Sequence, residues 1–116
     1  MYTNKEKPLA PDIYKNVKSA LGRSFYVQFD KIIENVRKTG IKYKAGELIL
    51  FGSRATGCET EKSDIDLAVS GVREFEKLKE EIEEIPTLLS FDIINLDTCR
   101  NDLLIKEIRT YGRKIL

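Results

Sequence analysis

The run Leu48-Ile49-Leu50-Phe51, which Gly52 ends at once, constrains the fold of this chain more than any other feature. Four consecutive apolar residues are too few for a helix of their own and are typical of a buried strand. In the later stretch 64–69 apolar and polar residues alternate, which predicts a second strand with Asp64 and Asp66 on one face. The chain is therefore expected to contain a sheet that carries two carboxylates on the same side of one strand.

Amphipathic segments on either side of these strands predict the helices that cover the sheet. The spacing of apolar residues predicts helices over 11–22, 25–40, 75–85 and 98–111, a third strand over 91–96, and a short strand or tail at 115–116. Gly22 and Gly40 are the expected ends of the first two helices, and Asp97 or Thr98 is the expected cap of the last. A chain of 116 residues has room for one modest core.

The residue inventory excludes several classes of catalysis and of partner. The sequence has no histidine and only two cysteines, so imidazole chemistry is impossible and any metal would be held mainly by oxygen. Its 20 Lys and Arg against 19 Asp and Glu give a formal charge of +1, which argues against strong binding to nucleic acid. No segment predicts a membrane span or a signal peptide, so we expect a soluble, cytoplasmic protein with Cys58 and Cys99 as free thiols.

The stretch 51–67 carries the residues best suited to chemistry. A glycine and a serine, Gly52-Ser53, directly follow a strand, where they let the backbone approach a phosphate and offer N–H and hydroxyl donors. Arg54 would add a charged fork to such a site. Asp64 and Asp66 emerge on one face about 6.5 Å apart at the backbone, close enough to bind one divalent ion or two neighbouring ones.

Asp92 lies in the otherwise apolar third strand, where a carboxylate is costly unless it is paired, hydrogen-bonded or bound to metal. If that strand pairs beside the strand of Asp64, the three aspartates form a set of hard oxygen ligands suited to Mg²⁺ or Mn²⁺. Two such ions about 3.5 to 4 Å apart activate an attacking hydroxyl and stabilise a leaving phosphate, so the residues indicate phosphoryl or nucleotidyl transfer. Structural roles stay open, because Gly52-Ser53 also suits a simple turn, Asp64 and Asp66 suit a half-exposed strand, and Asp92 suits a backbone hydrogen bond.

Two other motifs that resemble parts of this stretch are excluded by the residues at their required positions. A P-loop is excluded because Cys58 and Glu59 stand where it needs Lys and Ser or Thr. An EF-hand is excluded because Ala68 and Val69 stand where a third oxygen ligand and the turn glycine belong.

Gly52-Ser53, ten intervening residues, Asp64-Ile65-Asp66 and the later Asp92 together resemble the DNA polymerase β-type nucleotidyltransferase superfamily. The longer form, GSRATG followed by SDIDLAV, resembles its minimal nucleotidyltransferase (MNT) branch. The resemblance covers residues 25–116 and implies an α/β (α+β) fold, a small mixed β-sheet flanked by helices. Residues 1–22 match nothing in this pattern, so we expect an N-terminal helical extension over 1–22 and the catalytic domain over 23–116.

The resemblance also implies a role for each residue of the motif. Gly52-Ser53 would hold the β- and γ-phosphates of an NTP, with Arg54 as a further phosphate contact. Asp64 and Asp66 would bind two Mg²⁺ ions, for which Mn²⁺ could substitute, and Asp92 would complete the site of the catalytic metal and help the acceptor hydroxyl lose its proton. Transfer of a nucleoside monophosphate, expected to be AMP from ATP, would release pyrophosphate.

The same resemblance implies a protein partner. MNT proteins work with an all-helical HEPN-type or substrate-binding protein, and some are antitoxins that AMPylate a tyrosine of such a toxin. The alternative is a non-catalytic antitoxin or binding module that neutralises a helical partner by contact. An antibiotic-modifying transferase would share the site but would need an acceptor-binding domain beyond a chain of this length, and self-association stays open.

Overall fold

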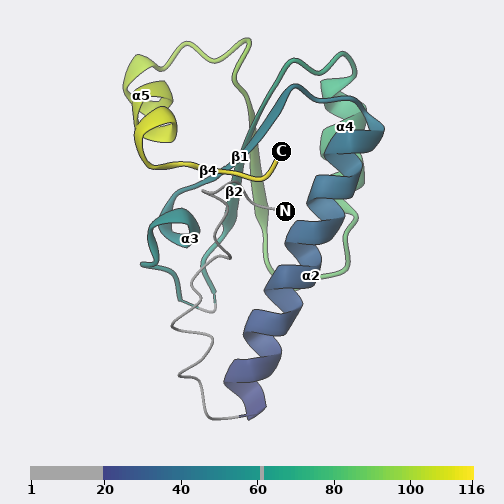
Figure 1. The fold of residues 1–116 in the computed structure, drawn as a ribbon, viewed down its shortest axis with the longest axis vertical. Coiled ribbons are helices and arrows are strands. Elements are labelled where there is room, and N and C mark those ends of the chain that lie inside the picture. Colours follow the sequence, from purple (N-terminus) through teal and green to yellow (C-terminus); the bar gives the residue numbers. More distant parts are fainter. Residues whose placement is uncertain (1–19, 61) are drawn as a thin grey trace.

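The computed structural model describes residues 20–60 and 62–116, which form four helices and four strands (Figure 1). In chain order these are α2 (Ala20–Lys42), β1 (Glu47–Phe51), α3 (Ser53–Thr56), β2 (Ile65–Ser70), α4 (Phe75–Glu83), β3 (Phe91–Asn95), α5 (Asp102–Tyr111) and β4 (Arg113–Lys114). None of these helices is long and apolar enough to cross a membrane.

The strands form one mixed sheet in the order β3-β2-β1-β4. Strand β1 is antiparallel to β2 and to β4, whereas β2 and β3 are parallel and are joined by a crossover through α4. Helices α2 and α4 cover one face of the sheet and α5 lies on the other, so the predicted small mixed sheet flanked by helices is confirmed (Figure 1).

Two apolar clusters, one on each face, hold the sheet between these layers. The larger cluster packs α2 and α4 against one face and includes the fully buried Leu48, Leu50, Leu67 and Ile82. The smaller cluster packs α5 against the other face. The alternation predicted for 64–69 is confirmed, because its odd-numbered positions all belong to the larger cluster and Ala68 belongs to the smaller one: Ile65, Leu67, Val69.

The helix ends expected at Gly22 and Gly40 are wrong, because α2 runs without a break from Ala20 to Lys42. A glycine costs a helix about 1 kcal/mol and does not end it when tertiary packing supports the helix on both sides. At Gly40 an added Cβ would lie 3.0 Å from a methyl group of Leu48, so this glycine allows close packing of α2 on the sheet. Residues 11–19 of the first predicted helix lie outside the described residues, and the domain boundary after residue 22 stays a prediction.

The cap predicted for the last helix is also wrong, since Asn101 caps α5 with a side-chain oxygen that accepts from the Leu104 N–H at 3.1 Å. The Asp97 carboxylate instead accepts from the Gly71 N–H at 2.8 Å and ties together the turns that follow β2 and β3. The short terminal strand is formed by residues 113–114, which precede the predicted 115–116 and pair with Ile49 and Leu50 of β1.

Candidate active site

The predicted site residues come together at the end of the sheet where β1 ends and β2 and β3 begin, which we call the carboxylate edge. The strand register places Asp66 between Phe51 of β1 and Asp92 of β3. Asp64 lies just before β2. Neighbouring strands are separated by about 4.8 Å, so the two paired aspartates are close neighbours. The strand pairing on which the predicted set of three aspartates depended is therefore present.

The three aspartates differ in their exposure to solvent. Asp66 is half-buried, while Asp64 and Asp92 are exposed. The cost that burial of Asp92 among apolar residues would carry does not arise, because Asp92 is exposed on β3, the outermost strand of the sheet. An exposed carboxylate beside a half-buried one leaves this side of the site open to an incoming group.

Gly52 links the end of β1 to the aspartates through a contact that the sequence did not reveal. Its backbone has φ of 77°, which favours glycine, and an added Cβ would collide with the carboxylate of Asp66. The residue is therefore required for two reasons, its conformation and its contact with Asp66. Ser53 follows at the start of α3, and within the described part of the chain its hydroxyl has no hydrogen-bond partner.

The pKa of Asp66 is raised to about 6, chiefly by burial and then by repulsion from Asp92 and Asp64, while Arg54 opposes the shift. A divalent cation bound at this edge would remove the repulsion, and carboxylate oxygens are the ligands that Mg²⁺ and Mn²⁺ prefer. The chemistry of the donors thus fits these ions. Over residues 20–60 and 62–116, however, no group of three or more acidic or cysteine side chains is already arranged to hold a metal.

Arg54 lies in the interior, with 3% of its surface exposed. Its Nε donates to the main-chain oxygen of Ser63 at 3.0 Å, its Nη2 donates to that of Thr60 at 3.3 Å, and its guanidinium lies 4.7 Å from the ring centre of Phe29. The structure therefore connects this side chain to the loop before Asp64. Its predicted contact with a phosphate stays a prediction.

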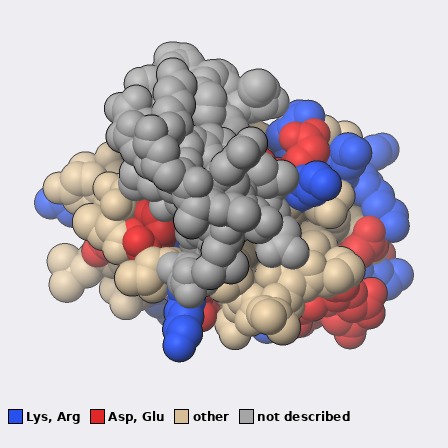
Figure 2. All heavy atoms as spheres, turned by 90° about the horizontal axis from the view of Figure 1, so that it is seen from below, with Lys and Arg blue, Asp and Glu red and all other residues tan. Residues whose placement is uncertain are grey.

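A second arginine, Arg113 of β4, was not singled out by the sequence. Its Nε donates to the main-chain oxygen of Ala55 in α3 at 2.7 Å, which fixes the turn that follows Gly52 and Ser53. Its position 58 residues further along the chain explains why no local pattern revealed it. The charged side chains seen at this end of the molecule are of both signs and intermixed (Figure 2).

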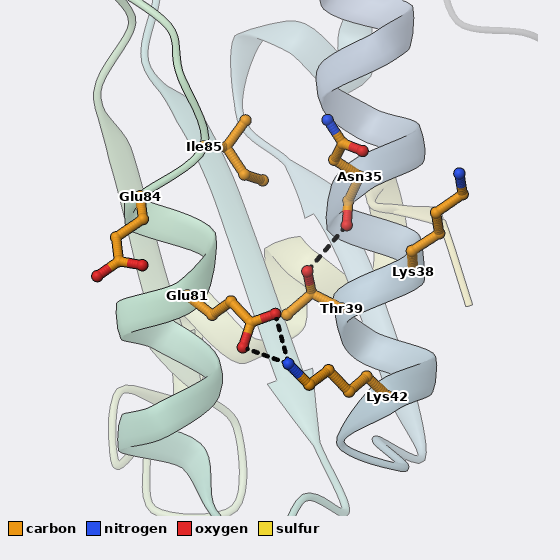
Figure 3. Close-up of a pocket in the computed structure, with 7 residues that line it drawn as sticks. All are labelled: Asn35, Lys38, Thr39, Lys42, Glu81, Glu84 and Ile85. Atoms are coloured by element: carbon orange, nitrogen blue, oxygen red, sulfur yellow. Dashed lines mark hydrogen bonds and ion pairs between the residues drawn. The ribbon is translucent and has the colours of Figure 1, made fainter.

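The carboxylate edge is distinct from the groove between α2 and α4, a cavity of about 260 Å³ (Figure 3). Lys42 Nζ spans this groove to the Glu81 carboxylate at 3.0 Å, and the Tyr43 hydroxyl donates to the same carboxylate at 2.8 Å. Lys42, Tyr43 and Glu81 satisfy one another and join the two helices. Lys38 and Glu84 also line the groove, and they make no side-chain hydrogen bond or ion pair among the described residues (Figure 3).

Comparison with known proteins identifies the class. The sequence profile of the family described as "Polymerase beta, Nucleotidyltransferase" matches residues 30–116. The chain therefore belongs to the polymerase β-type nucleotidyltransferase family, and its motif residues lie inside the matched region. No curated protein sequence matches the chain significantly.

Two solved structures share the fold at low sequence identity. One is a crystal structure of a toxin–antitoxin with AMP-PNP, at 21% identity and a TM-score of 0.55. The other is a mutant of the toxin–antitoxin MntA-HpeT in which two aspartates, two positions apart, are changed to glutamate, at 19% identity and a TM-score of 0.55. Each alignment covers 72% of this chain and 72% of the other.

Proposed function

We propose that this chain is a Mg²⁺-dependent nucleotidyltransferase subunit that moves AMP from ATP to a hydroxyl of a protein partner. The observation that carries the proposal is the contact at the sheet edge, where Asp66 packs against the backbone of Gly52 and pairs in register with Asp92. This arrangement brings the Gly52-Ser53 turn and the Asp64-x-Asp66 strand to one place, although ten residues separate Ser53 from Asp64 in the sequence.

Each residue at the edge has a proposed task. The backbone of Gly52 and the hydroxyl and N–H of Ser53 bind the β- and γ-phosphates, because a turn without bulky side chains lets phosphate oxygens approach. Asp64, Asp66 and Asp92 hold Mg²⁺, which when bound neutralises phosphate charge and activates the acceptor hydroxyl. Asp92 is exposed, which suits it to orient that hydroxyl and accept its proton before attack on the α-phosphate.

The partner is proposed to be an all-helical protein of the HEPN type, in a two-component toxin–antitoxin system. The support is that the two solved structures described above are toxin–antitoxin structures and that one of them was determined with AMP-PNP, a nucleotide analogue. The open edge at Asp92 agrees with an acceptor that arrives on another molecule. The isolated chain is accordingly expected to bind Mg-ATP weakly and to transfer little.

The decisive experiment incubates the chain, a co-purifying partner, Mg²⁺ and α-labelled ATP, and follows covalent label on the partner. Asp66→Asn should reduce labelling by about two orders of magnitude or more, because metal-held charge stabilisation contributes several kcal/mol to such transfer. Asp102→Asn is the matched control, since Asp102 is an exposed aspartate of α5 away from this edge. Labelling retained by Asp66→Asn would refute the catalytic proposal.

The competing proposal, neutralisation by contact alone, is supported by the absence among the described residues of a preformed metal-binding group. It predicts that a double variant, Asp64→Asn with Asp66→Asn, still neutralises the partner and that no label is transferred by the wild type. The catalytic proposal predicts that the double variant fails to neutralise the partner and that the wild type transfers label to it.

A further inference from the structure

We propose that Arg54 is a positioning residue that joins the two halves of the site, the Gly52-Ser53 turn and the Asp64-x-Asp66 strand. Its function would then be to fix the loop between them rather than to bind a phosphate. The inference rests on the proposed function for its meaning, but its structural part can be tested without catalysis.

The side chain starts next to Ser53 and ends next to Asp64. Arg54 directly follows Ser53 in the sequence, and its Nε donates to the carbonyl of Ser63, the residue immediately before Asp64. One side chain therefore spans the spacer of the motif. Its second donor, Nη2, reaches the carbonyl of Thr60 at 3.3 Å and restrains the same loop at another point.

The surroundings of the guanidinium keep it in this position. It is almost fully buried and lies 4.7 Å from the ring centre of Phe29, within the range of a cation–π contact. Phe29 itself is buried in the core against the sheet. Arg54 therefore couples the loop to α2 as well as to α3, and its planar fork suits two carbonyls better than the single ammonium of a lysine would.

The other hydrogen bonds in the middle of the loop are local. Within it the Thr60 N–H donates to the Ser63 hydroxyl at 2.9 Å, and the Ser63 N–H donates to the carbonyl of Thr60 at 3.1 Å. These bonds close a local turn but attach it to nothing else. The two ends of the loop are held by main-chain bonds, from the Cys58 N–H to the carbonyl of Ser53 at 3.0 Å and from the Ile65 N–H to the carbonyl of Ser90 at 2.9 Å. Between these ends, Arg54 attaches the loop to α3 through the carbonyls of Thr60 and Ser63.

A positioning role and a phosphate contact predict different measurements on the full chain. If Arg54 positions the loop, Arg54→Gln should accelerate amide hydrogen exchange over residues 57–64 by about tenfold or more. It should also weaken Mn²⁺ binding without nucleotide, followed by water-proton relaxation, and Mg-AMP-PNP binding, followed by NMR titration, by similar factors. If Arg54 binds a phosphate, only the affinity for Mg-AMP-PNP should fall, while loop exchange and Mn²⁺ affinity stay unchanged.

Two further variants keep the test decisive if Arg54→Gln fails to fold. Arg54→Lys retains the charge but loses the fork, so a positioning role predicts faster loop exchange, whereas a phosphate contact predicts near-normal nucleotide binding and exchange. Phe29→Leu leaves Arg54 in place but removes the ring, and a positioning role predicts a smaller acceleration in the same loop.

The matched control is Arg109→Gln, which removes an arginine that pairs with Glu47 at the opposite end of the sheet. It should leave exchange over 57–64 and Mn²⁺ affinity as in the wild type. Unchanged loop exchange in Arg54→Gln would overturn the inference. Wild-type chain that binds neither Mn²⁺ nor Mg-AMP-PNP would instead refute the proposed function, and the exchange result would still decide the role of Arg54 in the loop.

Discussion

Glu47 and Asp66 lie on the same face of the sheet, at opposite ends of the β1–β2 pair, and both are half-buried, yet the charges around them differ. Glu47 accepts from Arg109 at 2.8 Å and from the Ser70 hydroxyl at 2.8 Å, and Lys114 lies 3.6 Å away. Its pKa is lowered to about 2, first by the hydrogen bond from Arg109 and then by that from Ser70. The negative charge of Glu47 is therefore compensated by partners within the chain.

At the other end of the sheet, the negative charge of Asp66 lies close to two charges of the same sign. Asp66 is half-buried beside two further carboxylates, and its pKa is raised to about 6 by burial and by their repulsion. The ionised Asp66 thus destabilises the folded protein at one end of the sheet, and the ionised Glu47 stabilises it at the other. Glu47 has its partners within the chain, whereas on the proposed function these aspartates would acquire theirs from a ligand.

The largest effect is expected from Gly52→Ala, which should lower the free energy of unfolding by about 3 kcal/mol, because it combines an unfavourable backbone conformation with the collision at Asp66. Denaturant unfolding measures this. Gly57→Ala is the comparison variant, since Gly57 also has positive φ, 82°, but has nothing within 4 Å of an added Cβ. With ψ of 12° Gly57 lies in the left-handed helical region, whereas ψ of −158° places Gly52 in a region essentially restricted to glycine. Gly57→Ala should cost about 1 kcal/mol. Equal losses in the two variants would show that neither the backbone conformation of Gly52 nor its contact with Asp66 adds to the cost.

Glu47→Gln should have the next largest effect, a loss of about 1 to 2 kcal/mol at pH 7 after allowance for solvent screening. Because the folded-state pKa of Glu47 lies below the ordinary value of 4.5, its stabilisation is present above pH 4.5 and is lost as pH falls toward 2. Wild type and variant should therefore converge in stability over that window. Glu107→Gln, an exposed glutamate of α5, is the control and should change little. A constant gap between pH 5 and pH 2 would contradict the assigned charge network.

Asp66→Asn should have the smallest effect on stability and the opposite sign. Because the folded-state pKa of Asp66 lies above the ordinary 3.8, the ionised group destabilises the metal-free protein, and stability falls as pH rises from about 4 to 6. Removing the charge should therefore stabilise the metal-free chain at pH 7 by about 1 kcal/mol or less, given solvent screening. Thermal unfolding in EDTA at pH 4 and pH 7 tests this, and a variant less stable than wild type at pH 7 would contradict it.

Local patterns in the sequence were sufficient for the strands, because alternation and apolar runs depend on neighbouring residues alone. The pairing of Asp66 with Asp92 was only a condition of the sequence prediction, since it joins segments that are distant along the chain. The helix end at Gly40 could not be predicted, since the glycine is explained by Leu48 across the layer. The position of Arg54 was also hidden, because its acceptors are main-chain carbonyls that any residue at 60 and 63 would supply. What the sequence did not reveal are contacts between segments, and these hold the site in place.

The comparison between the two ends leads to one direct test of the central claim, that the Asp66 edge is a cation and nucleotide site. Thermal unfolding of the wild type and of Asp66→Asn should be measured at pH 7 in EDTA and then in Mn²⁺ with AMP-PNP. The order of stability should reverse, with the variant more stable in EDTA and the wild type more stable with the ligands, because only the intact carboxylates bind them. An identical rise in stability of both proteins on adding Mn²⁺ and AMP-PNP, or no rise in either, would contradict the claim.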